Sequence, residues 1–123
     1  MGIALWVVQV LLAAAFLVSG ATKLSQPKEK LAKNMAWVED FSHRAVRTIG
    51  ALEVLGAIGI VLPALSGILP SLTPLAALGL VLTMIGAALT HLRRAEYATI
   101  AVTAVLLILA AFVAYGRFIV PPA

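Results

Sequence analysis

Four long apolar blocks alternate with short polar segments along this chain. The blocks cover residues 3–22, 45–62, 72–91 and 97–115. Each comes close to the roughly 20 residues that an α-helix needs to cross the hydrocarbon core of a bilayer. The pattern predicts an all-α protein, an integral membrane four-helix bundle that forms one domain over residues 1–123.

Two of the connecting segments have patterns of their own. In the first, apolar residues recur at intervals of four, three and three: Leu31, Met35, Val38 and Phe41. With Pro27 as its start, this spacing predicts a short amphipathic helix in the membrane interface, which either closes the bundle or gates a cavity. The second, SGILPSLTP, is uncharged. Pro70 and Pro74 within it, together with Pro63 shortly before it, predict a tight hairpin between the second and third blocks.

Composition supports a membrane protein and excludes several functions. The chain is 63% hydrophobic and only 11% charged, whereas a soluble domain carries roughly 25% charged residues. The absence of cysteine excludes disulfides, thiolate nucleophiles and cysteine-held metals. The two histidines form no metal-binding pair, so we expect no metal site. The formal charge of +4 comes from residues between apolar blocks, which favours a lipid bilayer over nucleic acid as the partner.

Lysine and arginine are distributed unevenly among the connecting segments. Residues 23–44 contain five of them, with Arg47 just beyond, and residues 92–96 contain two, whereas the second connection has none. Because positive charge is retained on the cytoplasmic side, we expect both of these loops to be cytoplasmic and both termini to be outside. The first block lacks the positive region of a secretory signal and is expected to be a retained helix. Aromatic residues lie near the block ends, as in an interfacial belt: Trp6, Trp37, Tyr97 and Tyr115.

Glu53 interrupts the second block, where a carboxyl group is costly. We place it roughly 12 Å deep from the rise of a helix, level with Ala14 in the first block and with Thr83 and Met84 in the third. Three interpretations stay open. The group is a protonated hydrogen-bond donor between helices, or a carboxylate paired with Lys23 or Arg47, or part of a site for a polar head group or a proton.

Other residues at helical spacing complete the candidate site. The ligand or polar-core set is Glu53, Lys23, Ser19, Thr83, His91, Phe16 and Met84. His91 also fits an interfacial or capping histidine. A second set of small residues is expected to let helix backbones approach one another: Gly20, Gly50, Gly56, Gly59, Gly79 and Gly86. No residues are identified as catalytic.

Three motifs together resemble the DoxX-like family of small four-helix membrane proteins. They are FLVSGATKL (16–24), RTIGALEVLGAIGIVLP (47–63) and LTMIGAALTHLRR (82–94). The resemblance implies a bundle in the bacterial cytoplasmic (inner) membrane. The family takes its name from a subunit of a thiosulfate:quinone oxidoreductase, and most members have no assigned activity. Because the chain lacks cysteine, a thiol-based redox role is not expected.

These observations lead to two main functional hypotheses. In the first, the bundle binds a hydrophobic ligand with a polar head, a quinone or a lipid, or serves as the membrane subunit of a redox-linked complex. A quinone is then the candidate cofactor, and any enzymatic activity belongs to the quinone-linked complex. In the second, it is a structural or assembly subunit without a ligand. A small proton-coupled transporter is a third alternative, and small-residue faces are compatible with a homo-oligomer as well as with a partner redox subunit.

Overall fold

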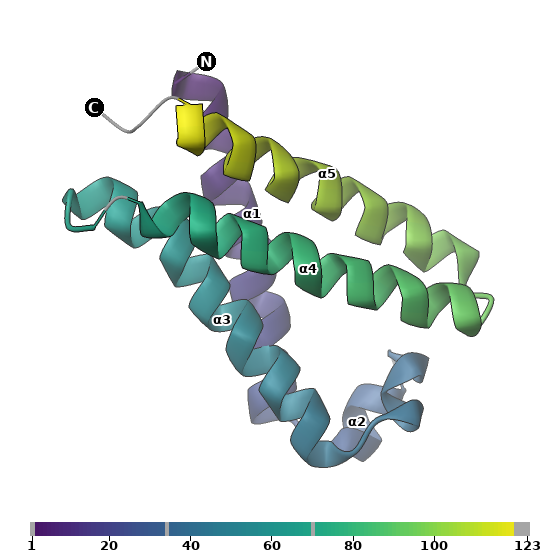
Figure 1. The fold of residues 1–123 in the computed structure, drawn as a ribbon. Helices are drawn as coiled ribbons and strands as arrows, with labels where there is room; N and C mark the ends of the chain where they lie inside the picture. Colours follow the sequence, from purple (N-terminus) through teal and green to yellow (C-terminus); the bar gives the residue numbers. More distant parts are fainter. Residues whose placement is uncertain (1, 34, 70, 120–123) are drawn as a thin grey trace.

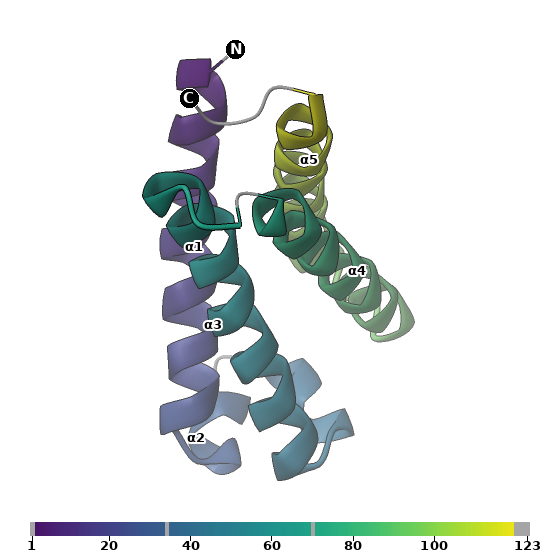
Figure 2. The ribbon, with the colours of Figure 1, turned by 60° about the vertical axis from the view of Figure 1, so that its left-hand side comes forward.

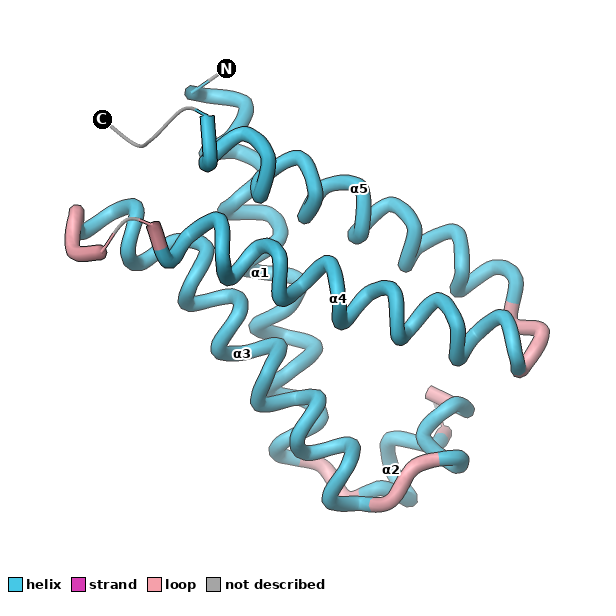
Figure 3. Tube along the Cα trace, in the orientation of Figure 1, coloured by secondary structure: helices cyan, strands magenta, loops and turns pink. Residues whose placement is uncertain are grey.

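The structure, a computed structural model, describes residues 2–33, 35–69 and 71–119. Four long helices dominate it: α1 (Gly2–Ser25), α3 (His43–Ser66), α4 (Leu72–Arg93) and α5 (Tyr97–Ile119) (Figure 1). All four are long and apolar enough to cross a membrane. Short loops join them, and no strand occurs in the described ranges (Figure 3). The predicted all-α membrane bundle is confirmed, with every helix a few residues longer than its apolar block.

The four helices form two pairs that diverge from a common end. α1 packs along α3, and α4 packs along α5. Near the N-terminus of α1 the two pairs are close, whereas toward α2 (Lys28–Ala32) they spread apart (Figures 1 and 2). The main core fills the close end with Leu12, Phe16, Ile60, Leu80 and Val113. The spread end is therefore where space between the pairs can remain.

Apolar and polar side chains are distributed as a bilayer requires. Large apolar side chains such as Leu11, Leu55 and Ile108 are exposed on the outer faces of the helices. Several polar side chains are instead buried between helices: Gln9, Lys23, Glu53, Thr73, His91, Thr103 and Arg117. In hydrocarbon a polar group must find its partners inside the protein, so these buried residues are the places to look for a site.

The turn between α3 and α4 differs from the predicted proline hairpin. Pro63 lies inside α3, which continues to Ser66 and ends at Gly67 with a left-handed φ of 74°. Pro74 lies in the first turn of α4, where a backbone N–H has no helical acceptor in any case. Pro70 lies outside the described residues. α3 continues through Pro63, as transmembrane helices can at a proline, and close by the Gln9 amide of α1 donates to the Ile60 carbonyl.

The first loop folds as two short helical segments, where the spacing predicts a single amphipathic helix. α2 begins after Pro27, as expected, and a 3₁₀ segment, η1 (Ala36–Asp40), follows it. The break turns the apolar side chains toward one another and toward α3. Leu31, Val38 and Val46 form a small buried cluster, with partly buried Met35, Trp37 and Phe41 packed against it. The loop is thus anchored beneath the spread end of the bundle.

Candidate functional site

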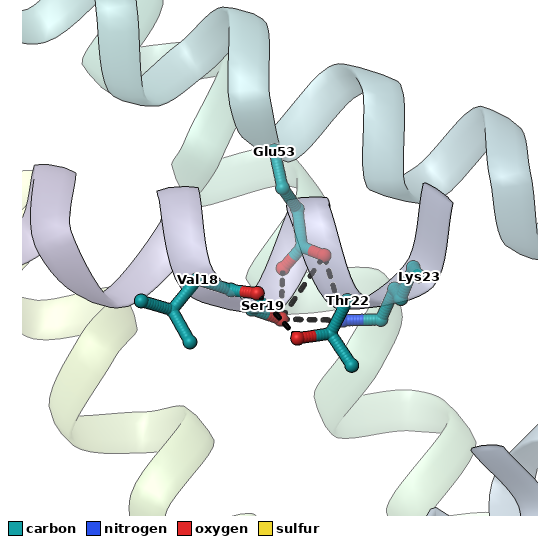
Figure 4. Close-up of polar contacts among 5 residues, drawn as sticks. All are labelled: Val18, Ser19, Thr22, Lys23 and Glu53. Atoms are coloured by element: carbon teal, nitrogen blue, oxygen red, sulfur yellow. Dashed lines mark hydrogen bonds and ion pairs between the residues drawn. The ribbon is translucent and has the colours of Figure 1, made fainter. Parts of the chain in front are cut away.

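Glu53 lies at the centre of a buried polar cluster between α1 and α3. Its Oε1 is 2.7 Å from the Lys23 Nζ. The Ser19 hydroxyl donates to both carboxylate oxygens, at 3.2 and 3.3 Å, and accepts a hydrogen bond from Lys23. Figure 4 shows the three side chains converging, while the Thr22 hydroxyl donates to the Val18 carbonyl of its own helix. Of the two basic partners considered from sequence, the structure selects Lys23.

Close helix packing brings these side chains together. A Cβ built onto Gly20 would lie 2.5 Å from the Gly50 carbonyl oxygen, so the α1 and α3 backbones nearly touch there. Ser19 and Lys23 are four residues apart and share one face of α1. Gly56 and Gly59 similarly admit Leu80 and Ala76 of α4. In contrast, a Cβ on Gly79 or Gly86 would meet nothing within 4 Å, so these two glycines mediate no close approach among the described residues.

The predicted depth of Glu53 in the bundle is wrong by more than one helical turn. Its carboxylate lies level with Ser19 and Lys23, whereas counting from the block ends placed it level with Ala14. Counting assumes straight, parallel helices that begin together. Here α1 extends to Ser25 and α3 begins at His43, and their alignment is set by the Gly20–Gly50 contact. The carboxylate is consequently nearer the loop end of the bundle.

The cluster retains unused hydrogen-bonding capacity. An ammonium group has three N–H donors, and among the described residues Lys23 uses two, one for Glu53 and one for Ser19. Glu53 Oε2 accepts only the long bond from Ser19. Lys23 and Glu53 are 5% and 3% exposed, and together they carry no net charge. The pair therefore presents one donor and one acceptor side by side.

This cluster forms one wall of a cavity between the two helix pairs. The cavity, which we call the cleft, has a volume of about 660 Å³. Ser19, Lys23 and Glu53 line it from the first pair, and Thr83, Met84 and Gly86 from α4. The hydroxyls of Thr83 and Thr103 donate to carbonyls of their own helices, so they are available to a ligand as acceptors. Phe16 is buried in the main core and is not among the residues that line the cleft.

Aromatic and charged residues lie together where the first loop meets the end of α4 beside the cleft. Trp37 and His91 both line it, with their rings edge to face at 6.4 Å. His91 Nδ1 is 2.9 Å from Glu96 Oε1, and Arg94 Nε donates to Glu96 Oε2 at 3.3 Å. The hydrogen bond with His91, reinforced by Arg94, holds the pKa of Glu96 below its usual value. The sequence pattern places Trp37 in an aromatic belt and near the apolar face of the first-loop helix, and neither placement predicts its contact with His91.

A second buried cluster lies at the close end of the bundle and was missed from sequence. The Arg117 guanidinium donates to Gln9 Oε1 at 2.7 Å and lies 5.2 Å from the centre of the Trp6 ring. Gln9 in turn donates to the Ile60 carbonyl. The fourth apolar block ends at residue 115, which leaves Arg117 outside it in the sequence, but α5 continues to Ile119 and buries it. The glutamine inside the first block was the available signal that a partner had to exist.

Comparison with protein families supports the resemblance seen in the sequence motifs. Residues 7–113 match the model of the DoxX-like family. This range includes all residues of the Glu53 cluster and the whole lining of the cleft. No curated protein and no solved structure matches the chain.

Proposed function

The chain belongs to the DoxX-like family of membrane proteins, and we propose that it binds a membrane amphiphile, with a polar head and an apolar tail, in the cleft between its helix pairs. Lys23 and Glu53 bind the head, and the apolar walls bind the tail. The observation that carries the proposal is a buried ion pair whose remaining donor and acceptor border an open, mostly apolar cavity.

The charge of the cluster favours an uncharged head group. Lys23 and Glu53 neutralise each other, so a charged head placed against them would remain without a counter-ion in a region of low dielectric constant. A carbonyl can accept from the third Lys23 N–H, and a hydroxyl can also donate to Glu53 Oε2. A quinone, its quinol and an uncharged lipid all provide such groups.

The size and lining of the cleft favour an amphiphile over a small polar solute. Its volume of about 660 Å³ falls within the ~300–1,000 Å³ that is usual for small-molecule sites. Away from the ion pair the walls are largely aliphatic, with Leu52, Val102 and Leu106 among them. Such walls stabilise a hydrocarbon tail by removing it from water or by replacing lipid contacts.

Location and assembly follow from this proposal together with the distribution of charge. With the first loop in the cytoplasm of a bacterial cell, the end of the cleft beside that loop faces the cytoplasmic interface of the inner membrane. If the ligand is a quinone, the protein fits the membrane subunit of a redox-linked complex, in which partner subunits supply the electron-transfer centres. If it is a lipid, no redox partner is required.

Native mass spectrometry tests the proposal on protein extracted in a mild detergent. Wild-type protein should retain an amphiphile, whose mass identifies it as quinone or lipid, and Glu53→Gln should lower its retention. Arg117→Met is the matched control, because it removes a buried charge that lies away from the cleft. An empty wild-type protein, or equal retention in Glu53→Gln, would contradict the proposal.

A structural role is the second candidate, and one observation favours it. The Lys23–Glu53 pair joins α1 to α3 where Gly20 and Gly50 pack most closely. If joining these helices is its whole role, Glu53→Gln lowers the thermal stability of the protein, while the activity of any complex that contains it is retained. The mass-spectrometry experiment separates the two candidates because it detects the ligand directly.

A further inference from the structure

Trp37 occupies the point where the first loop meets both helix pairs. It belongs to η1, and its ring centre lies 5.6 Å from Nζ of Lys23 on α1. The ring also makes edge-to-face contacts with Phe41, at 5.5 Å, and with His91 of α4, at 6.4 Å. It lines the cleft at its wide end. Among the described residues, no other aromatic ring makes a cation–π contact with the Lys23 ammonium.

The Trp37 ring is a third contact of the Lys23 ammonium, in addition to Glu53 and Ser19. Two of the three ammonium N–H groups donate to Glu53 and Ser19. The indole ring of Trp37 makes a cation–π contact with the same ammonium. A π face attracts a cation, but a carbonyl or hydroxyl oxygen forms a shorter, charge-assisted hydrogen bond with it. The indole is therefore a contact that a suitable head group can replace.

The anchoring of η1 allows the ring to move without unfolding the loop. Val38, the next residue, is fully buried with Leu31 and Val46 in the small cluster beneath the bundle. Trp37 itself is only partly buried, and its contacts with Phe41 and His91 are made by ring edges. Rotation about its side-chain bonds can thus expose Lys23 while the backbone of η1 stays in place.

We propose that Trp37 covers the head-group subsite of the cleft and is displaced from Lys23 when an amphiphile binds. The subsite is the face of the Lys23 ammonium next to the indole, bordered by Glu53 Oε2. This inference rests on the proposed ligand-binding function and adds to it the position of the head and the residue that competes for it. Trp37 controls access to the cleft and opposes binding.

Chemical labelling tests the covering role without any ligand. The chain has no cysteine, so Thr83→Cys introduces a single thiol that lines the cleft. In nanodiscs, adding Trp37→Ala should raise the rate of N-ethylmaleimide labelling several-fold, whereas adding Trp6→Ala at the other end of α1 should leave it unchanged. Equal labelling rates with and without the Trp37 side chain would overturn the covering role.

Binding measurements test the displacement. The probes are a decyl-substituted benzoquinone and an uncharged short-chain diacylglycerol, which represent the two head-group classes. For the probe that binds, Trp37→Ala should raise the affinity by a factor of roughly 2 to 30, the range expected when a competing cation–π contact is lost. Trp37→Phe, which preserves an aromatic ring in the loop, should give a smaller increase and serves if the alanine variant does not insert.

The results separate this inference from the function on which it rests. A lower affinity in Trp37→Ala would show that the indole is a wall of the occupied site, and an unchanged affinity would place it outside the subsite. Either result overturns the displacement while leaving ligand binding intact. Failure of both probes to bind any variant would overturn the proposed function and the displacement together, and the labelling experiment would still decide whether Trp37 covers the cleft.

Discussion

The two ends of the bundle solve the problem of a buried cation in different ways. At the spread end, Lys23 is paired with a carboxylate and lies on the wall of a cavity. At the close end, Arg117 is 4% exposed, bonds the neutral Gln9 amide, and does not line the cleft. Both clusters connect helices that are distant in sequence, but only the first borders a space that a ligand can enter.

The comparison shows that access, and not burial alone, distinguishes a candidate site from a structural contact. An ionisable residue within a membrane span is a functional candidate by default, and both cations satisfy that criterion. Arg117 and Gln9 connect α5 to α1, and Gln9 also bonds the α3 backbone near Pro63. The close-end cluster thus holds three helices together. The spread-end cluster leaves a donor and an acceptor facing the cleft.

Removal of the carboxylate is expected to have the largest effect on stability. Glu53→Gln preserves a hydrogen-bonding side chain but leaves the Lys23 ammonium buried without a counter-ion, a change that costs on the order of 3–5 kcal/mol for buried pairs. Thermal unfolding in detergent should show the loss. The double variant Lys23→Met/Glu53→Leu should recover most of the stability while failing to retain an amphiphile. A double variant as unstable as Glu53→Gln would mean that the pair is needed for the fold itself.

Arg117→Met should destabilise the protein less and leave the cleft unaffected. It removes the hydrogen bond to Gln9 and the contact with Trp6, and the glutamine oxygen remains buried without its donor, at a cost of about 1–3 kcal/mol. The same thermal unfolding assay measures this loss. Labelling of a cysteine at position 83 provides the complementary measurement and should not change. Altered labelling would show that the two ends are coupled and would break the distinction between them.

Much of the fold could be predicted because hydrocarbon imposes simple rules. Four apolar blocks, each near the length of a bilayer crossing, admit little other than four helices. The rules concern length and polarity, so they fail where a side chain compensates for a local violation. Pro63 was assigned to the hairpin because proline is a general helix breaker, whereas α3 continues through it to Ser66; the hydrogen bond from Gln9 to Ile60 nearby cannot be read from either segment alone.

Part of the buried cluster could be predicted from the sequence, but its alignment could not. Glu53, Lys23 and Ser19 stand out in the sequence because each is polar within an apolar setting. Their relative depth depends on where two helices cross, and the Gly20–Gly50 contact that fixes it lies between chain segments thirty positions apart. The role of Trp37 was hidden for a similar reason, since its partners Lys23 and His91 belong to two other helices.

Two glycine substitutions compare the rigidity of packing at the two ends. Gly20→Ala would press a methyl group against the Gly50 backbone, which cannot move aside, and should cost roughly 1–3 kcal/mol by overpacking. Gly116→Ala would meet the Leu5 side chain, which can change rotamer, so the loss should be smaller. Gly79→Ala, with nothing within 4 Å, is the control and should be close to neutral. The unfolding temperature should fall most in Gly20→Ala, less in Gly116→Ala and least in Gly79→Ala. A reversed order would contradict the proposed difference in the rigidity of packing.

Acidification should disturb the spread end selectively, and this is the smallest effect we expect. The pKa of Glu96 is held below its usual value, first by the hydrogen bond with His91 and also by Arg94. A carboxyl with a lowered pKa in the folded state stabilises the fold above its unfolded pKa, and this contribution is lost as the pH falls through the folded pKa. The His91 ring that contacts Trp37 then loses its bond to Glu96, so Trp37 fluorescence in a Trp6→Phe protein should change at acidic pH. Glu96→Gln should abolish this dependence. In the close-end cluster, the Gln9 amide and the Arg117 guanidinium do not take up a proton at acidic pH, so fluorescence of Trp6 in a Trp37→Phe protein should change less. A matching acid transition in both proteins would mean that the ends respond as one unit.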